Sequence, residues 1–240
     1  MKAFILAAGL GTRLKPLTDN KPKALIEVNG ITLLEYAIKK ISESGFKSII
    51  VNVHHFAGQV IDFLNRKKFR GVEIAVSDES NLLLDTGGGL KNVRWFFSDE
   101  KPFLIHNVDI ISDINLTGLY KQHLGNNSIA TLAVQKRKSS RYFLFDHEKK
   151  LCGWKNIKTG EIRNTRLPEG EMSEMAFSGI QIVEPEIFKL MPEESIFSLV
   201  DLYLQIANKS RIVYFDHSNS LFLDLGKKEK LTEAEKIIPG

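Results

Sequence analysis

Apolar and amphipathic stretches alternate along the first half of the chain. Apolar runs of strand length occupy residues 4–7, 48–53, 72–76 and 102–108. Stretches with apolar residues at helical spacing lie between them, at residues 32–44, 58–66 and 90–97. Alternating strands and helices indicate βαβ units, so the pattern predicts a mostly parallel sheet that is covered by helices on both faces.

The second half of the chain has shorter elements. Strands are predicted at residues 130–134, 142–145, 151–154, 176–183, 211–215 and 221–225, with a hairpin turn at 146–150. Helices are predicted at residues 115–124, 185–191, 196–208 and 228–237. Residues 156–173 contain Gly160, Pro168 and Gly170 and predict an exposed loop. No repeat or flexible linker interrupts the series, so we expect a single α/β domain over residues 1–240.

The composition is typical of a globular protein, with 43% hydrophobic and 26% charged residues. Residues 1–20 contain Arg13, Lys15 and Asp19 and therefore lack the apolar segment of a signal peptide. No apolar run is long enough to span a membrane. The single cysteine, Cys152, has no partner for an internal disulfide. We therefore expect a cytoplasmic protein with no membrane partner.

The net charge of +4 suits polyanionic ligands without requiring nucleic acid, and we expect no nucleic-acid partner. The densest basic run, Lys136 to Arg141, lies between two predicted strands. Its simplest interpretation is a solvated hairpin loop. The alternative is that Arg141 leans over a substrate pocket.

The loop after the first strand carries the strongest chemical signal. Gly9 and Gly11 let the backbone approach a ligand or adopt positive φ, so that successive N–H groups can point at an anion. Arg13 adds a planar fork of donors for phosphate oxygens, and Lys23 adds a compact charge. This combination predicts a polyphosphate site. It is neither of the two commonest phosphate loops, because GxxxxGK[ST] is absent and Leu14 stands where a dinucleotide fingerprint has its third glycine or alanine.

Residues 6–25, LAAGLGTRLKPLTDNKPKAL, resemble the signature of the sugar-nucleotidyltransferase family, LAAGxG[ST]R[LM]xPLTxxxPK[AP]L. The match includes two loop prolines, Pro16 and Pro22, and is too long to arise by chance. The resemblance implies a Rossmann-like nucleotidyltransferase fold with a mixed, mostly parallel central sheet and helices on both faces. It also implies a nucleotide-binding half over residues 1–110 and a sugar-phosphate-binding half over residues 111–226. Since only fourteen residues follow Gly226, we expect no C-terminal β-helix domain.

The resemblance also implies roles for individual residues. Arg13 grips the departing pyrophosphate and Lys23 the α-phosphate, so both are expected to be catalytic. The implied nucleotide-binding residues are Leu6, Ala8, Gly9, Gly11, Thr12, Arg13, Lys23, Asp85, Thr86, Gly87 and Gly88.

Residues 85–89, DTGGG, are similar to the E-T-G-G-G of one branch of the family, which contains the N-acetylmuramate 1-phosphate and mannose 1-phosphate enzymes. A glycine run at a helix N-terminus presents free N–H groups to an acceptor, here a base edge or a phosphate. The alternative is a flexible turn with Thr86 as its cap.

Two aspartates lie at the ends of predicted buried strands, where open α/β sheets bind their ligands. Asp109 ends the segment FLIHNVD and Asp224 ends LFLD, and each alone could be a cap or a turn residue. The resemblance to the family's N-G-D and [FW]-x-D-[IV]-G segments implies that both hold one Mg²⁺, which prefers a few carboxylates with phosphate oxygens and water. Val108 replaces the family glycine with a branched side chain beside the nucleotide sugar, and Lys227 replaces a threonine after the second motif.

The implied sugar-phosphate-binding residues are Asn107, Lys155, Ser178 and Gly179. Phe177 to Ile180 resembles the F-S-G-I of the same branch, whose backbone lines the sugar pocket, although an ordinary buried strand would have the same pattern. The Glu-Lys-Pro segment that holds the sugar phosphate in thymidylyltransferases is missing. Lys155 is the nearest candidate for its lysine, and a surface lysine at a strand end is the alternative.

These features predict a sugar-1-phosphate nucleotidyltransferase, which makes a nucleoside-diphosphate sugar and pyrophosphate from a nucleoside triphosphate and a sugar 1-phosphate. The branch similarity favours N-acetylmuramate 1-phosphate uridylyltransferase, with mannose-1-phosphate guanylyltransferase or another sugar-1-phosphate enzyme as the alternative. A catalytically inactive nucleotide-binding regulatory protein is an alternative from another class, raised by Val108. A nicotinamide-dependent oxidoreductase fails on Leu14 and on the absence of a ribose carboxylate after the second strand. We expect a monomer or a homodimer.

Overall fold

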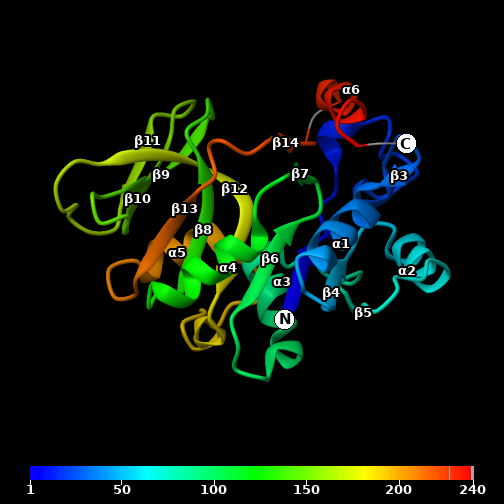
Figure 1. Cartoon of the computed structure of the whole chain (residues 1–240), viewed down its shortest axis with the longest axis horizontal. Coiled ribbons are helices and arrows are strands. Elements are labelled where there is room, and N and C mark those ends of the chain that lie inside the picture. The colour runs from blue at the N-terminus through cyan, green and yellow to red at the C-terminus, as the bar shows by residue number, and fades with distance from the viewer. Residues whose placement is uncertain (227, 239–240) are drawn as a thin grey trace.

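The computed structural model describes residues 1–226 and 228–238. A central sheet has the strand order β11-β10-β9-β12-β6-β1-β4-β5, with β8 beside β12 and β13 beside β8 (Figure 1). Its strands are β1 (Lys2–Leu6), β4 (Ser48–Val53), β5 (Glu73–Asp78), β6 (Phe103–Asn107), β8 (Ala130–Gln135), β9 (Arg141–Phe145), β10 (Leu151–Asn156), β11 (Glu161–Asn164), β12 (Ser173–Val183) and β13 (Ile212–Asp216). Two small ribbons stand beside it, made of β2 (Glu27–Val28) with β3 (Ile31–Thr32) and of β7 (Ile110–Ser112) with β14 (Phe222–Asp224).

The helices are α1 (Leu33–Glu43), α2 (Ala57–Arg66), α3 (Asp85–Asn92), α4 (Leu116–Gly125), α5 (Leu199–Ile206) and α6 (Glu229–Glu235). Short 3₁₀ turns occupy Thr12–Leu14, Lys23–Leu25, Arg94–Phe97 and Pro185–Lys189. No helix within the described residues is long and apolar enough to cross a membrane.

The sheet is parallel from β6 through β1 and β4 to β5, and antiparallel pairing begins where β12 joins β6. Alternate residues of β1 and β4 point to opposite faces, as strand geometry requires. Phe4 and Ile50 pack in one cluster with side chains of α3 and α5, whereas Ile5 and Val51 pack in another with α1, α2 and α4. The predicted fold, a mixed sheet with helices on both faces, is therefore confirmed.

Local sequence explains where α1 begins and ends. The hydroxyl of Thr32 accepts the N–H of Glu35, which caps the helix N-terminus. Gly45 follows the helix with a φ of 92°, a conformation that glycine adopts without a steric cost. The apolar side of α1, including Leu34, Ile38 and Ile41, lies in the second cluster, so the helical spacing in the sequence matches the observed burial.

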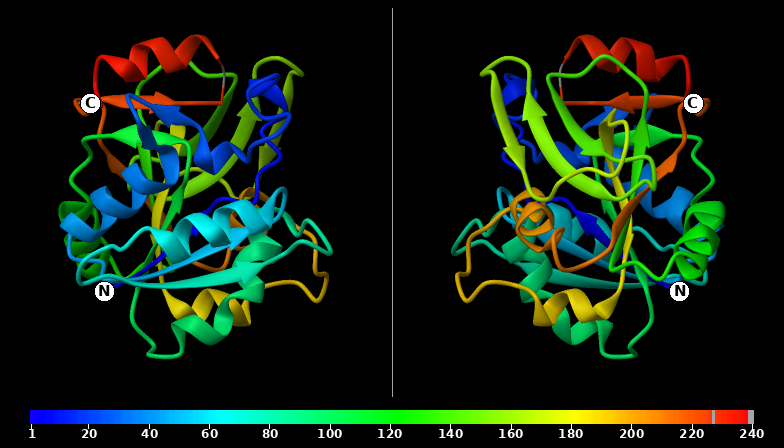
Figure 2. Two further views of the ribbon diagram at one scale, coloured as in Figure 1. Left: turned by 90° about the vertical axis from the view of Figure 1, so that its right-hand side faces the viewer. Right: turned by 90° about the vertical axis from the view of Figure 1, so that its left-hand side faces the viewer.

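A third, smaller apolar cluster holds the ends of the chain together. Leu14 of the N-terminal loop, Ile111 of β7, Leu225 and Ala234 of α6 are buried in it. Figures 1 and 2 show α6 above the β7–β14 ribbon, apart from the helices that cover the sheet. The N-terminal loop is consequently held from outside by the C-terminal segment.

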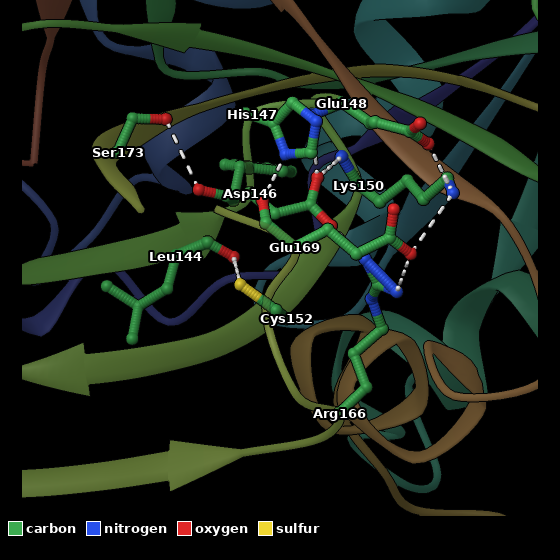
Figure 3. Close-up of polar contacts among 10 residues, drawn as sticks. Leu144, Asp146, His147, Glu148, Lys150, Cys152, Arg166, Glu169 and Ser173 are labelled. Atoms are coloured by element: carbon green, nitrogen blue, oxygen red, sulfur yellow. Dashed lines mark hydrogen bonds and ion pairs between the residues drawn. The ribbon is translucent and has the colours of Figure 1, made fainter. Parts of the chain in front are cut away.

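The segment predicted as an exposed loop at 156–173 is only partly a loop, so that prediction is wrong in part. Residues 161–164 form β11, which pairs with β10. Arg166 then turns inward and forms an ion pair with Asp146, whose side chain is completely buried (Figure 3). The neighbouring Lys150 contacts the carboxylates of Glu148 and Glu169. These ion pairs tie the returning segment to the β9–β10 turn, a long-range contact that local composition does not reveal.

Three buried histidines make the fold sensitive to acid. Burial lowers the pKa of His106, His123 and His217 to about 4, so the folded protein keeps these rings neutral. A histidine in the unfolded chain has a pKa near 6.5. Between pH 6.5 and 4 it is therefore protonated in the unfolded state but neutral in the folded state. We expect the free energy of unfolding to fall across this window, by about 1.4 kcal/mol per pH unit for each histidine.

Urea denaturation between pH 7.5 and 4.5 tests this expectation. Carboxyls whose pKa is raised by burial, such as the buried Glu79 and the half-buried Glu184, act in the opposite direction, so the slope against pH is compared between variants. His123→Gln should reduce the slope, while His147→Gln, a change at an exposed position, should leave it unchanged. Equal slopes in all three proteins would contradict the assignment.

Candidate active site

Two cavities adjoin at the carboxyl ends of the parallel strands, which is where open α/β sheets bind ligands. The first has a volume of about 590 Å³ and the second about 640 Å³, each large enough for a substrate of nucleotide or sugar size. Arg13, Asn107 and Asp109 line both cavities. Figure 2 shows the N-terminal loop and the β9–β10 hairpin rising on this same end of the sheet. Ligands in the two cavities would therefore meet at these three side chains.

The N-terminal loop forms one wall of the first cavity. Gly11 has a φ of +65°, and a Cβ there would lie 2.9 Å from the Thr18 methyl carbon and 3.1 Å from the Lys23 Cβ, so glycine is required. The Thr18 hydroxyl donates to the carbonyl of Gly11 at 2.9 Å. Leu14 is buried in the third cluster, which explains why the position differs from a dinucleotide fingerprint. Nearly all the predicted nucleotide-binding residues line this cavity: Leu6, Ala8, Gly9, Gly11, Thr12, Arg13, Lys23, Asp85 and Thr86.

The two predicted cations occupy different surroundings. Lys23 is only 9% exposed, and its ammonium forms an ion pair with the carboxylate of Asp109. Arg13 lies beside Gly226, where an added Cβ would be 2.9 Å from the Arg13 Nη2 and 2.9 Å from the Asp224 Oδ1. Gly226 therefore leaves room for the guanidinium next to the second aspartate.

Pairing of β7 with β14 brings the two predicted metal ligands together, although 115 residues separate them in the sequence. Asp109 directly precedes β7, and its carbonyl accepts the N–H of Leu225 at 2.9 Å. Asp224 ends β14, and its Oδ1 accepts the N–H of Gly226 at 2.8 Å. Both aspartates line the second cavity. Lys227, the other departure from the family motif, lies outside the described residues.

The donor set fits a magnesium ion that takes part of its coordination from substrate. Within the described residues, no three histidine, cysteine or acidic side chains are grouped for metal binding. Mg²⁺ needs only one or two carboxylates when phosphate oxygens and water complete its shell. Asp109 and Asp224 could supply these two carboxylates.

Val108 belongs to both the core and the cavity. Its side chain is 5% exposed and packs in the second apolar cluster, while its N–H donates to the carbonyl of Leu6 at 3.1 Å. It also lines the first cavity. The branched side chain that replaces the family glycine is thus packed mainly in the apolar core.

The glycine run at 85–89 opens α3, as predicted, but its amides are not free. The N–H groups of Gly87 and Gly88 both donate to the carbonyl of Phe197, at 2.9 and 3.2 Å, and neither residue lines the first cavity. The prediction that Gly87 and Gly88 present free N–H groups to a nucleotide is therefore wrong for this conformation. Asp85 and Thr86 do line the cavity, and the Thr86 hydroxyl accepts the N–H of Leu199 at the start of α5.

Close packing explains these glycines. A Cβ on Gly88 would lie 2.0 Å from the carbonyl oxygen of Ser195, and one on Gly87 would lie 2.4 Å from the Phe197 ring. A Cβ on Gly89 would lie 2.9 Å from the Asn52 amide nitrogen. The Lys91 ammonium also donates to the carbonyls of Pro192 and Glu193. The run thus seats α3 against the segment before α5.

We expect Gly88→Ala to destabilise the protein by about 1–3 kcal/mol, the usual cost of overpacking, despite the better helix propensity of alanine. The measurement is urea denaturation with activity as a second readout. Gly58→Ala in α2 is the matched control, because no atom lies within 4 Å of its added Cβ. Equal stability of the two variants would show that the Ser195 segment moves away freely.

Of the predicted sugar-phosphate residues, Asn107, Ser178 and Gly179 line the second cavity. Gly179 has a φ of +69°, and a Cβ there would lie 2.7 Å from the Asn107 Nδ2. The Ser178 Oγ and the His217 Nε2 are 2.8 Å apart, so this hydroxyl is already partnered.

Lys155 does not line the second cavity, so the structure does not bring it together with the other predicted sugar-phosphate residues, and the alternative of a strand lysine outside the pocket fits its position. Its ammonium pairs with the carboxylate of Glu174 and lies 5.7 Å from the centre of the Tyr142 ring. Its neighbours on β10, Trp154 and Asn156, line the cavity instead.

The basic run after β8 supplies residues that sequence reasoning assigned to solvent. Arg137 and Arg141 both line the second cavity, together with Lys158 from beyond β10. The solvated-loop interpretation is thus wrong for Arg137, whereas Arg141 is exposed and also lines the cavity, as the alternative interpretation expected. In the sequence, only the position of the basic run directly after a buried strand indicated that its side chains could reach a cavity.

A protein-family comparison matches residues 2–239 to the nucleotidyl transferase family. N-acetylmuramate alpha-1-phosphate uridylyltransferase of Caulobacter vibrioides is 31% identical over 220 residues, which are 88% of this chain and 86% of that protein. UTP–glucose-1-phosphate uridylyltransferase of Synechocystis is 30% identical over 241 residues, which are 95% of this chain and 60% of that protein. UDP-glucose pyrophosphorylase of Acinetobacter baumannii has the same fold, with a TM-score of 0.80 at 15% identity over 98% of this chain and 91% of that one.

Proposed function

The chain belongs to the nucleotidyl transferase family, and we propose that it couples a nucleoside triphosphate to a sugar 1-phosphate with release of pyrophosphate. Relatives at about 30% identity that act on sugar 1-phosphates support this reaction class. The observation that carries the proposal is the pair of adjoining cavities that share Arg13, Asn107 and Asp109. Two substrates held in these cavities would place their phosphates at the shared wall.

The reaction needs little covalent chemistry from the protein. A non-bridging oxygen of the sugar phosphate forms a bond to the α-phosphorus of the triphosphate. The bridging bond between the α- and β-phosphates breaks, and pyrophosphate leaves with its electron pair. Because the attacking oxygen is already anionic, no general base is required. Positioning and charge neutralisation supply the catalysis.

We assign these tasks to the residues around the shared wall. Lys23, held at the cavity wall by Asp109, would neutralise the α-phosphate, and Arg13 would bind the departing pyrophosphate. Asp109 and Asp224 would hold Mg²⁺, which would neutralise the phosphate charge. Asp85 and Thr86, which also line the first cavity, would contact the nucleoside.

For the specific substrates we propose N-acetylmuramate 1-phosphate and a uridine nucleotide. The similarity to the Caulobacter vibrioides enzyme over most of both chains supports this choice. The basic side chains of Arg141 and Lys158 at the second cavity also suit a sugar that carries a carboxylate.

A pyrophosphate-release screen tests both the proposed reaction and the proposed substrates. Each of the four common nucleoside triphosphates is combined with the 1-phosphates of N-acetylmuramate, mannose, glucose and N-acetylglucosamine. We expect the highest rate with UTP and N-acetylmuramate 1-phosphate. A higher rate with GTP and mannose 1-phosphate would replace the substrate assignment and keep the reaction. Nucleotide binding without turnover of any sugar phosphate would favour an inactive regulatory protein.

A further inference from the structure

Arg137 is a half-buried cation in the wall of the second cavity. It follows β8, and its guanidinium carbon lies 4.5 Å from the centre of the Phe222 ring. Its Nη2 donates to the carbonyl of Phe177 at 2.8 Å. These two contacts hold the guanidinium plane against the cavity wall, so little side-chain freedom remains to be lost when a ligand binds.

The charge of Arg137 has no anionic partner in the part of the chain that the structure describes. Among the described residues, no acidic side chain forms an ion pair with Arg137, and other basic residues nearby, such as Lys155 and Arg163, do have carboxylate partners. Its Nε is buried and makes no hydrogen bond with a described residue. Burial also lowers the pKa of the guanidinium, an effect that Asp224 partly offsets. A half-buried cation that forms no ion pair and is only partly offset by a neighbouring carboxylate is costly for the folded protein unless an anionic ligand compensates it.

The location of Arg137 indicates which part of the ligand it meets. Phe222 and Asp224 are two residues apart on β14, so their side chains point to the same face of the strand. The guanidinium that stacks on Phe222 is therefore next to one of the two proposed magnesium ligands. Asp109, the other ligand, and Arg13 line the same cavity. The attacking phosphate must reach this point for the proposed reaction to occur.

We propose that Arg137 binds the phosphate group of the sugar 1-phosphate and orients its oxygen for attack. The inference rests on the proposed function and adds a residue to it. A planar fork with free donors matches a phosphate, which accepts two parallel N–H bonds.

Other cations of this region do not meet the same conditions. Lys155 is paired with Glu174 outside the cavity. Arg141 and Lys158 line the cavity but are exposed to solvent, where a single charge contributes little. They are better suited to a distal substituent of the sugar than to the reacting phosphate.

The test compares Arg137→Met, which keeps the length and the apolar stem of the side chain, with Lys155→Met as the matched control. Isothermal titration calorimetry measures the binding of N-acetylmuramate 1-phosphate, with inorganic phosphate as a second probe. We expect Arg137→Met to weaken the binding of both probes roughly 10- to 100-fold, the range for a hydrogen bond to a charged group. Lys155→Met should bind both as the wild type does.

Steady-state kinetics separates this role from a structural one. Arg137→Met should raise the KM for the sugar 1-phosphate, leave the KM for the nucleotide unchanged, and not lower the thermal unfolding midpoint, since it removes a costly half-buried charge. Arg137→Lys should restore part of the affinity, because it returns the charge without the fork. If Arg137→Met fails to fold, the binding and kinetic measurements on Arg137→Lys test the inference instead.

The outcomes distinguish this inference from the proposed function. Normal turnover and unchanged phosphate affinity in Arg137→Met would overturn the inference and leave the function standing. Weakened binding of both probes in a protein that turns over no sugar phosphate would keep the phosphate-binding role of Arg137 and overturn both the proposed function and the orienting role that rests on it. A loss of affinity in Lys155→Met equal to that in Arg137→Met would also overturn the inference.

Discussion

Asp109→Asn should lower the rate of pyrophosphate release roughly 100-fold or more at saturating Mg²⁺, while the protein stays folded. The amide is nearly isosteric with the carboxylate but carries no charge, and hard cations such as Mg²⁺ depend on charged oxygen ligands. The change also removes the ionic partner of Lys23, so the lysine loses its fixed position at the cavity wall. Both effects reduce charge neutralisation at the reacting phosphates.

Asp224→Asn should behave alike, because β14 places this carboxylate beside the same cavity. If both carboxylates bind one ion, the double variant should lose far less than the sum of the two single losses. The measurement is kcat against Mg²⁺ concentration, with circular dichroism to verify folding. Asp62→Asn on the exposed side of α2 is the control and should be fully active. Near-normal rates for Asp109→Asn at saturating Mg²⁺ would sink the metal assignment.

Arg13→Ala should lower kcat and kcat/KM together, by about 2.7–4 kcal/mol in transition-state stabilisation. Negative charge grows on the departing pyrophosphate as the α–β bond breaks, so a donor aimed at it acts mainly in the transition state. Arg13→Lys should rescue poorly, since a point charge cannot reproduce two parallel hydrogen bonds. Gly226→Ala should resemble Arg13→Ala in part, because its Cβ would displace the guanidinium.

Lys23→Ala distinguishes the role of Lys23 from that of Arg13. Lys23 would contact the α-phosphate in both ground and transition states, so its loss should also raise the KM for the nucleotide. Steady-state kinetics of both variants, with each substrate varied in turn, provides the comparison. If Arg13→Ala raised only the KM for the sugar phosphate, the loop would be binding the acceptor rather than the leaving group.

The features that the sequence predicted well are local ones. The alternation that produces β1, α1 and β4 repeats within a few residues, and each helix or strand buries its apolar side against the sheet. The N-terminal loop could also be predicted from the sequence, because its glycines, Arg13 and Lys23 lie within fifteen residues of one another. Local pattern was sufficient wherever backbone conformation and chemistry depend on neighbours in the sequence.

The errors arose where a residue's partner is distant in the sequence. Gly87 and Gly88 had the pattern of a ligand-binding helix start, but Phe197, more than a hundred positions later, accepts their N–H groups. Lys155 had the charge expected of a phosphate ligand, yet its ammonium pairs with Glu174 on β12 and does not line the cavity. Hydrogen bonds and ion pairs of this range follow from the packing of whole elements, so composition around each residue carries no trace of them.

By itself, the sequence determined the class of fold, and it singled out the glycine loop and the two aspartates as candidates, because each depends on short segments with a distinctive pattern. Only the tertiary structure decided which side chains meet. Pairing of β7 with β14 joins Asp109 to Asp224, burial of Leu14 under α6 holds the loop, and the β8–β9 turn brings Arg137 over Phe222. These contacts result from strand order and close packing, which involve the whole chain at once.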